Sequence, residues 1–186
     1  MKKSFVALFL IFALLVSSCS TMKIVHNKQR DKLQKKADKY RLFGGVSEIG
    51  EAMSQREDIA RDKARTDAYI KIGQSIQSRI DGVSSLYIKE SGEGADSEII
   101  DIFEKSAKVI INTTIQGIFA VDETITLKDD TYTVYGLYAI TPRSINTRLM
   151  KELKEQQPEI YERFLLSKTY GDMEEEVMQY EKEIIQ

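Results

Sequence analysis

The sequence of 186 residues has little of the chemistry that metal and catalytic sites use most. It contains one cysteine (Cys19), one histidine (His26), two prolines and no tryptophan. Two cysteines are needed for a disulfide, so none can form within this chain. Because Cys19 and His26 both lie near the N-terminus, the remaining residues cannot build a Cys/His zinc cluster or a Ser-His or Cys-His catalytic pair. We therefore expect no metal, no cofactor and no catalytic residue.

The chain also lacks a strong excess of either charge. Lysine and arginine number 27 against 29 aspartate and glutamate residues, which gives a net charge of −2. A general nucleic-acid binder normally has a strongly basic domain, so we expect no nucleic-acid partner. The composition, 42% hydrophobic and 30% charged, is ordinary for a globular protein, and the length suits one domain with targeting elements.

The longest apolar run covers residues 5–16 and follows Lys2 and Lys3. A membrane-spanning helix needs about 20 apolar residues, whereas this run has the length of a signal-peptide core. The sequence Val16-Ser17-Ser18-Cys19 comes next and resembles a lipobox. This resemblance implies a signal peptide over 1–18 and a mature lipoprotein that carries acyl chains such as palmitate on Cys19. An ordinary signal peptide with a chance cysteine, or an uncleaved anchor, are the alternatives.

A polar, basic segment follows Cys19. Between Ser20 and Tyr40 there are seven basic residues and two acidic ones, a net charge of +5. This composition predicts a tether over 19–40, which is either solvated or lies against anionic lipid headgroups. More than one acyl chain makes anchoring stable. Ser20 after the cysteine, in place of aspartate, favours the outer membrane under the proteobacterial sorting rule, and the inner membrane is the alternative.

The stretch from 54 to 80 predicts the long helix around which the domain is built. Small and branched apolar residues recur at every fourth position, a spacing that predicts one buried helix face. These residues are Ala60, Ala64, Ala68, Ile72, Ile76 and Ile80. A strand with a glycine bend is predicted before it, over 42–50. Asp81-Gly82 predicts a break after it, with 83–88 either a strand or an irregular continuation of the helix.

Gly44-Gly45 invites comparison with a phosphate-binding loop. No Gly-Lys-Ser/Thr follows it, so we reject that interpretation. Residues 90–96 predict an acidic loop, which lacks the regular oxygen ligands of a calcium site.

A second helix is predicted from Asp96 or Ser97, and it gives way to strand near 111–112. Its apolar stripe is Ile99, Phe103, Ala107 and Ile110. Residues 113–128 and 132–141 are rich in β-branched and aromatic side chains, which predicts a hairpin with Asp129-Asp130 as its turn. Both faces of the second strand have apolar residues, so we expect one face against helices and the other partly exposed. Its tyrosines either line a ligand groove or are half-buried in the core.

The last part of the chain predicts a helical C-terminal extension over 143–186. Ser144 is the expected first cap, Gly171 an expected C-terminal stop, and Asp172 with Glu175 a capping box for a last helix. From 151 on, ten acidic residues outnumber five basic ones. This charge is opposite to that of the tether, so the two segments either contact each other or stay solvated. The predicted class is α+β, with a small, mostly antiparallel sheet packed by helices in a domain over 41–142.

Three of these segments stand in a distinctive order. They are the glycine-containing strand 43–50, the Ala-rich helix 60–68 running into 76–80, and the late hairpin that ends in Tyr135-Gly136-Leu137-Tyr138. Following a lipobox, this order resembles the Lpp-twenty type of bacterial lipoprotein domain over about 42–142. The resemblance implies an α+β domain on the periplasmic side of the cell envelope, similar to one in some flagellar basal-body-associated proteins. It implies no catalytic motif.

We weigh three functions. The first is a non-enzymatic envelope lipoprotein, anchored in the membrane through Cys19, whose body binds another envelope protein as a structural or interaction module. The second is a regulatory lipoprotein that activates an envelope enzyme or supports flagellar or envelope assembly. The third is a hydrolase with paired carboxylates, but no Asp or Glu is marked out by an apolar setting. The first function is our expectation, and a homo-oligomer is left open.

Overall fold

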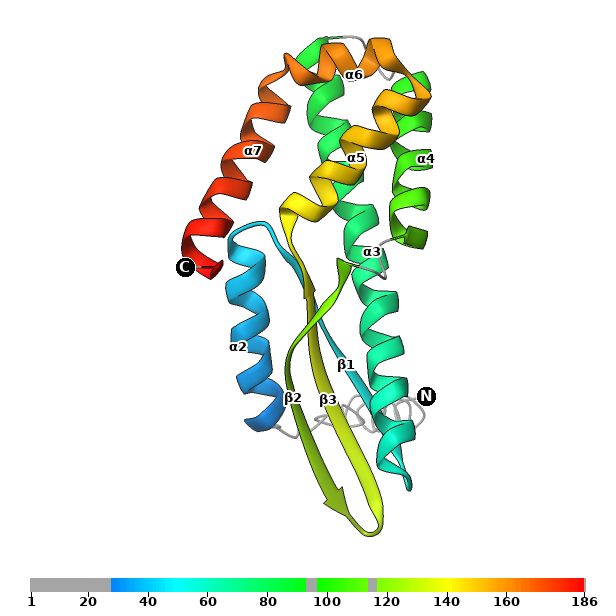
Figure 1. Cartoon of the computed structure of the whole chain (residues 1–186), viewed down its shortest axis with the longest axis vertical. Coiled ribbons are helices and arrows are strands. Elements are labelled where there is room, and N and C mark those ends of the chain that lie inside the picture. Colours follow the sequence, from blue (N-terminus) through cyan, green and yellow to red (C-terminus); the bar gives the residue numbers. More distant parts are fainter. Residues whose placement is uncertain (1–27, 93–96, 114–116, 186) are drawn as a thin grey trace, which may run out of the picture.

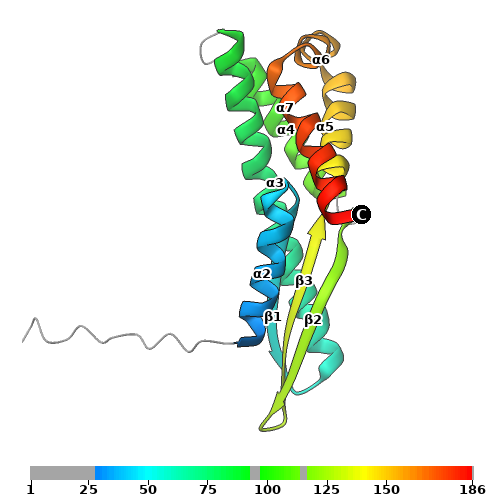
Figure 2. The ribbon, with the colours of Figure 1, turned by 90° about the vertical axis from the view of Figure 1, so that its left-hand side faces the viewer.

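The computed structural model describes residues 28–92, 97–113 and 117–185. An antiparallel sheet in the order β1-β3-β2 lies between helices α2 and α3 (Figures 1 and 2). The elements around this sheet are α2 (Lys28–Leu42), β1 (Val46–Ser54), the first part of α3 (Glu57–Ser91), β2 (Phe119–Lys128) and β3 (Thr131–Ile140). The predicted α+β class is confirmed, with a long helix on the sheet and a helical C-terminus.

A group of helices extends beyond the sheet. Here the second part of α3 packs with four further helices (Figure 1). They are α4 (Ser97–Thr113), α5 (Pro142–Gln156), α6 (Pro158–Leu165) and α7 (Lys168–Tyr180), which ends in a π-helical turn, η2 (Glu181–Ile185). The molecule thus has a sheet half, made of α2, the three strands and residues 57–72 of α3, and a helical half, made of residues 73–91 of α3 with α4–α7.

The predicted stripe on α3 is confirmed, since all six residues from Ala60 to Ile80 are buried. The small residues lie where the helix crosses β1. A methyl group added to Gly50 of β1 would sit 1.7 Å from the backbone oxygen of Ala64. Glycine on the strand and alanine on the helix therefore allow the two backbones to approach closely.

The predicted break at Asp81-Gly82 is wrong, because α3 continues to Ser91. Val83, Ser84 and Tyr87 extend the buried stripe into the helical half. A glycine inside a helix costs about 1 kcal/mol relative to alanine, and burial of these side chains offsets that cost. Gly92, with φ of 69°, forms the left-handed C-cap that ends the helix.

The predicted hairpin is confirmed, with Asp129 and Asp130 both at positive φ (48° and 54°) in the turn. That geometry matches the right-handed twist of the flanking strands. The strand begins later than expected. Helix α4 runs to Thr113, and β2 starts at Phe119. The buried Ile110 holds the β-branched end of α4 in the core, so tertiary packing overrides strand propensity there.

Both faces of β3 are buried from Val134 to Ile140, so the prediction of a partly exposed face is wrong for that part of the strand. Tyr138 faces α3 and stacks edge-on against Tyr69, with ring centroids 5.5 Å apart. Tyr135 and Leu137 are buried in a second cluster on the α2 side. Tyr135 and Tyr138 of β3 are therefore core residues.

The covering helix on that side is α2, which corrects the expected tether over 19–40 for its described part. Leu33 and Ala37, four residues apart, are fully buried against Ile49, Tyr135 and Leu137. Two apolar residues in a basic run give a weak sequence signal, but they suffice because β3 supplies the rest of the cluster. Residues 1–27, with the expected signal peptide and Cys19, lie outside the described residues.

The C-terminal helices share one core with α3 and α4. Phe164 of α6 contacts the rings of Tyr87, Phe103 and Tyr170, with centroids 5.1–6.0 Å apart. The expected cap of the first C-terminal helix is wrong. Thr141, not Ser144, caps α5 by accepting a hydrogen bond from the backbone N–H of Ser144.

The last helix begins earlier than predicted. Ser167 accepts a hydrogen bond from the backbone N–H of Tyr170, so α7 starts at Lys168. It then runs through Gly171, Asp172 and Glu175, which excludes the predicted stop and capping box. Thr169 and Met173 are buried and begin the apolar face of the helix.

Candidate functional site

An apolar cleft lies between α3 and α7 in the helical half. It has a volume of about 380 Å³. One wall comes from α3 and the other from α7. The lining residues are Arg79, Gly82, Val83, Leu86, Thr169, Asp172, Met173 and Glu176. Val83 and Met173 form a buried apolar floor, while Leu86 stands at the rim with 59% of its surface exposed.

An ion pair closes the end of the cleft nearest the sheet. The Arg79 guanidinium donates hydrogen bonds to both carboxylate oxygens of Glu176 and to the backbone oxygen of Gly44, the latter at 3.1 Å. Only 17% of the Arg79 side chain is exposed. Gly44 has φ of 82°, and a methyl group there would overlap the Glu176 side chain. This contact joins α3, α7 and the turn before β1.

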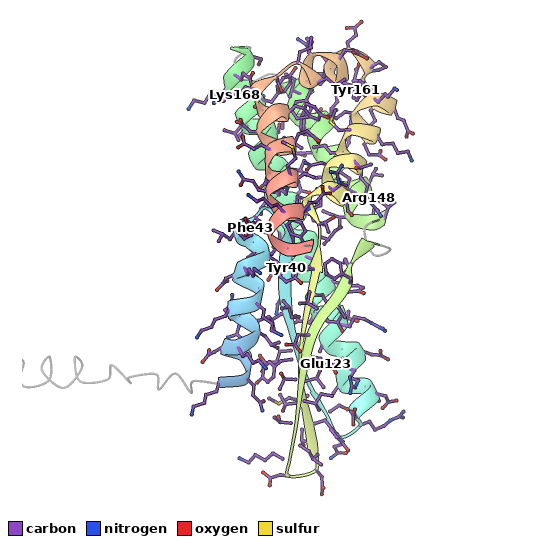
Figure 3. All side chains as sticks on the ribbon, turned by 60° about the vertical axis from the view of Figure 1, so that its left-hand side comes forward. Tyr40, Phe43, Glu123, Arg148, Tyr161 and Lys168 are labelled. Atoms are coloured by element: carbon purple, nitrogen blue, oxygen red, sulfur yellow. The ribbon has the colours of Figure 1, made fainter. Side chains whose placement is uncertain are left out.

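A carboxylate closes the other end of the cleft. Glu90, in the last turn of α3, accepts hydrogen bonds from the backbone N–H groups of Lys168 (2.6 Å) and Thr169 (2.9 Å) and from the Thr169 hydroxyl. These bonds lower the pKa of Glu90 below its ordinary value. Lys168 marks this end of α7 in Figure 3, and Tyr40 lies near the opposite end. The two helices are thus joined at both ends of an apolar cleft.

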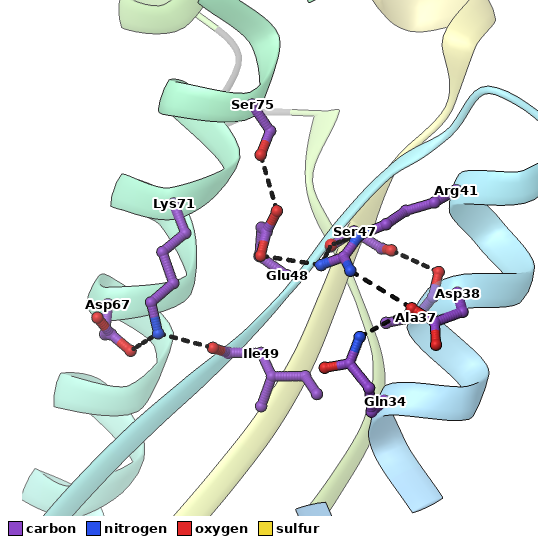
Figure 4. A network of polar contacts seen from close by, with 10 residues as sticks. All are labelled: Gln34, Ala37, Asp38, Arg41, Ser47, Glu48, Ile49, Asp67, Lys71 and Ser75. Atoms are coloured by element: carbon purple, nitrogen blue, oxygen red, sulfur yellow. Dashed lines mark hydrogen bonds and ion pairs between the residues drawn. The ribbon is translucent and has the colours of Figure 1, made fainter. Parts of the chain in front are cut away.

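The free edge of β1 is covered by charged side chains rather than exposed to a partner strand (Figure 4). Arg41 donates to the backbone oxygen of Ser47, and Lys71 donates to that of Ile49 at 3.0 Å. The Asp67 carboxylate accepts from the backbone N–H of Glu51. In an edge strand, every second residue directs its backbone N–H and C=O groups away from the sheet. Ser47, Ile49 and Glu51 are three such residues of β1. Side chains therefore occupy the positions that an added strand would use.

The rest of this network joins Glu48 of β1 to side chains of both helices that flank the sheet. Arg41 also pairs with Glu48 at 3.0 Å, and Glu48 accepts a hydrogen bond from Ser75 of α3. Lys71 pairs with Asp67 at 2.6 Å. These contacts lower the pKa of Asp67, although its partial burial opposes the shift. The network ties α2 and α3 to the edge of β1.

Cys19, the one site residue that the sequence predicts, lies outside the described residues. Within 28–92, 97–113 and 117–185, no group of three His, Cys, Asp or Glu side chains is placed to hold a metal ion. No helix in those ranges is both long enough and apolar enough to cross a membrane. The cleft residues Arg79, Glu90 and Glu176 were not singled out from the sequence, because their partners lie 78 to 97 residues away along the chain.

Comparison of the chain with protein-family models, with curated proteins and with solved structures found no match.

Proposed function

We propose that this chain is a non-enzymatic lipoprotein of a bacterial cell envelope that binds another envelope protein. In this proposal Cys19 carries acyl chains that anchor it in the outer membrane. Residues 28–185 then face the periplasm, and the cleft between α3 and α7 receives the partner. Membership of the Lpp-twenty type family is part of the same proposal.

The observation that carries the proposal is the apolar cleft with polar residues at both of its ends. Val83 and Met173 give it an apolar floor, and Leu86 gives it an exposed apolar rim. A protein partner that inserts one large apolar side chain would bury this surface. Polar groups such as Asp172 at the rim could then orient the partner, which is the usual anatomy of a binding hot spot.

The shifted carboxyl groups support a non-enzymatic role. Among the described residues, each carboxyl whose pKa is displaced has it lowered by hydrogen bonds or cations, as in Asp67, Glu90 and Asp122. A carboxylic acid that donates a proton near neutral pH needs a raised pKa. These groups are therefore suited to structural ion pairs and helix capping.

A site-specific photo-crosslinking experiment tests the proposal. A benzophenone amino acid replaces Leu86 at the cleft rim, and the matched control places it at Leu166, which is 89% exposed outside the cleft. Illumination of intact cells should yield one defined adduct from position 86 and not from 166. The adduct should be lost in the Cys19→Ala variant, which leaves the chain without its anchor.

Two results would contradict the proposal. If positions 86 and 166 give the same adducts, the cleft has no preferred protein partner. If Cys19→Ala fractionates and crosslinks like the unaltered chain, acylation of Cys19 does not anchor the protein, and the proposed lipid anchor is wrong.

A further inference from the structure

Four lysines lie on one face of α2. Lys28, Lys32, Lys35 and Lys39 follow the spacing i, i+4, i+7, i+11, which places them on one face of a helix. All four are exposed. The buried residues Leu33 and Ala37 lie on the opposite face of α2. We call these four residues the lysine stripe; it is about 16 Å long.

The lysine stripe differs from two other cations of α2, which form ion pairs with strands of the sheet. Lys36 pairs with Asp122 of β2, and Arg41 pairs with Glu48 of β1. Within the part of the chain that the structure describes, none of the four stripe lysines forms a salt bridge. The pKa of Asp122 is lowered mainly by the hydrogen bond from Lys36. The positive charge of Lys32 makes the smallest contribution to this shift. The stripe therefore presents its charge outward.

The position of the stripe relates it to the proposed anchor. Lys28 follows Cys19 after eight residues, 20–27. Nine peptide units reach at most about 32 Å, so a lipid on Cys19 keeps the first turn of α2 close to the membrane surface. Anionic headgroups at that surface attract clustered lysines within about one Debye length.

The charge of α7 gives this contact an orientation. The C-terminal ends of α2 and α7 meet, with Tyr40 and Tyr180 rings 6.3 Å apart (Figure 2). Glu175 on α7 is exposed and Glu174 is half-buried. An anionic surface attracts α2 and repels these carboxylates, which favours an orientation with α2 rather than α7 against the membrane.

We propose that the lysine stripe of α2 is a docking surface for anionic lipid headgroups, which orients the anchored domain on the membrane. This inference rests on the proposed lipid anchor and adds the orientation of the anchored domain. The occupant is the headgroup layer of the membrane that holds the acyl chains.

Lysine acetylation of the lipidated chain in vesicles tests the inference. The purified full chain is reconstituted into phosphatidylcholine vesicles with or without phosphatidylglycerol, and acetylation rates are read by mass spectrometry. The stripe lysines should react about threefold or more slowly with phosphatidylglycerol present, and high salt should remove the protection. The exposed lysines Lys63, Lys89, Lys105 and Lys108 serve as internal controls and should react equally in both vesicles.

Matched variants give an independent readout. Leu42 is 76% exposed at the C-terminal end of α2, and a Leu42→Cys thiol can carry a polarity-sensitive fluorophore because the acylated Cys19 cannot. Phosphatidylglycerol should shift the emission to the blue. Replacing the four stripe lysines by glutamine should abolish the shift, and replacing the four control lysines by glutamine should leave it unchanged.

The outcomes separate the inference from the proposed function. If the chain floats with vesicles but neither lysine protection nor the emission shift depends on phosphatidylglycerol, the headgroup contact is wrong and the anchor stands. If the stripe is protected equally in both vesicles and in detergent, a second copy or another protein segment covers it, and the inference is overturned. If the chain does not float, the anchor and the inference fail together.

Discussion

The long helix α3 packs through small residues in the sheet half and through large ones in the helical half. In the sheet half, α3 meets β1 through Ala60, Ala64 and Gly50, with backbone close to backbone. In the helical half, the same helix contributes isoleucines and Tyr87 to a core that contains Phe103 and Phe164. A substitution that adds atoms at the α3–β1 contact should therefore destabilise the sheet half. A substitution that removes atoms from the large core side chains should destabilise the helical half.

The largest effect is expected from Gly50→Ala in the sheet half. The added methyl group would lie 1.7 Å from the Ala64 backbone oxygen and 2.8 Å from the Ala68 nitrogen, so α3 must move off the sheet. We expect a loss in the free energy of unfolding of roughly 5 kcal/mol, measured by urea denaturation. Gly82→Ala is the control, because its methyl group meets nothing. It should stabilise α3 by about 0.5–1 kcal/mol.

The next largest effect is expected from Phe164→Ala in the helical half. The substitution leaves a cavity among Tyr87, Phe103 and Tyr170 and should cost about 3–5 kcal/mol in the free energy of unfolding. Leu166→Ala removes apolar atoms from the surface instead and should change stability by less than about 0.5 kcal/mol. Equal losses for the two variants would contradict the described core.

The ion pair at the end of the cleft nearest the sheet should have an intermediate effect. Glu176→Gln weakens the ion pair with Arg79, whose side chain is only 17% exposed, and should cost about 1–3 kcal/mol in thermal or urea unfolding. Glu181→Gln is the matched control, since it removes the exposed pair with Arg143. We expect that control to unfold like the unaltered protein. A larger loss in the control would show that the cleft is not held by Glu176.

The smallest effect is a local loosening of α7 in acid. The pKa of Glu90 is lowered in the folded protein by N–H donors from Lys168 and Thr169. The cap therefore contributes its stabilisation above the ordinary carboxyl pKa and loses it as pH falls through the lowered folded value. Hydrogen exchange of the first turn of α7 should accelerate over that range. In Glu90→Gln the exchange should be fast already at neutral pH and should show no such acid step.

Periodic patterns made much of the fold predictable. The stripe from Ala60 to Ile80 and the Asp129-Asp130 turn are local signals, and both are confirmed. The expected break in α3 at Asp81-Gly82 was wrong because the continuing buried face outweighs the cost of one glycine. The expected tether was wrong over 28–40 because two apolar residues in a basic run gave too weak a periodicity to indicate a helix.

The sequence by itself determined the α+β class, the long central helix and the hairpin, since periodicity, turn residues and helix breakers act between near neighbours. Only the tertiary structure decided that α2 covers β3, because the burial of Leu33 depends on residues about a hundred positions away. It likewise decided the candidate cleft. Arg79 and Glu176 are 97 residues apart. Because the chain has 56 charged residues, the sequence does not indicate which acidic residue pairs with which basic one. Packing of the apolar faces brings them together.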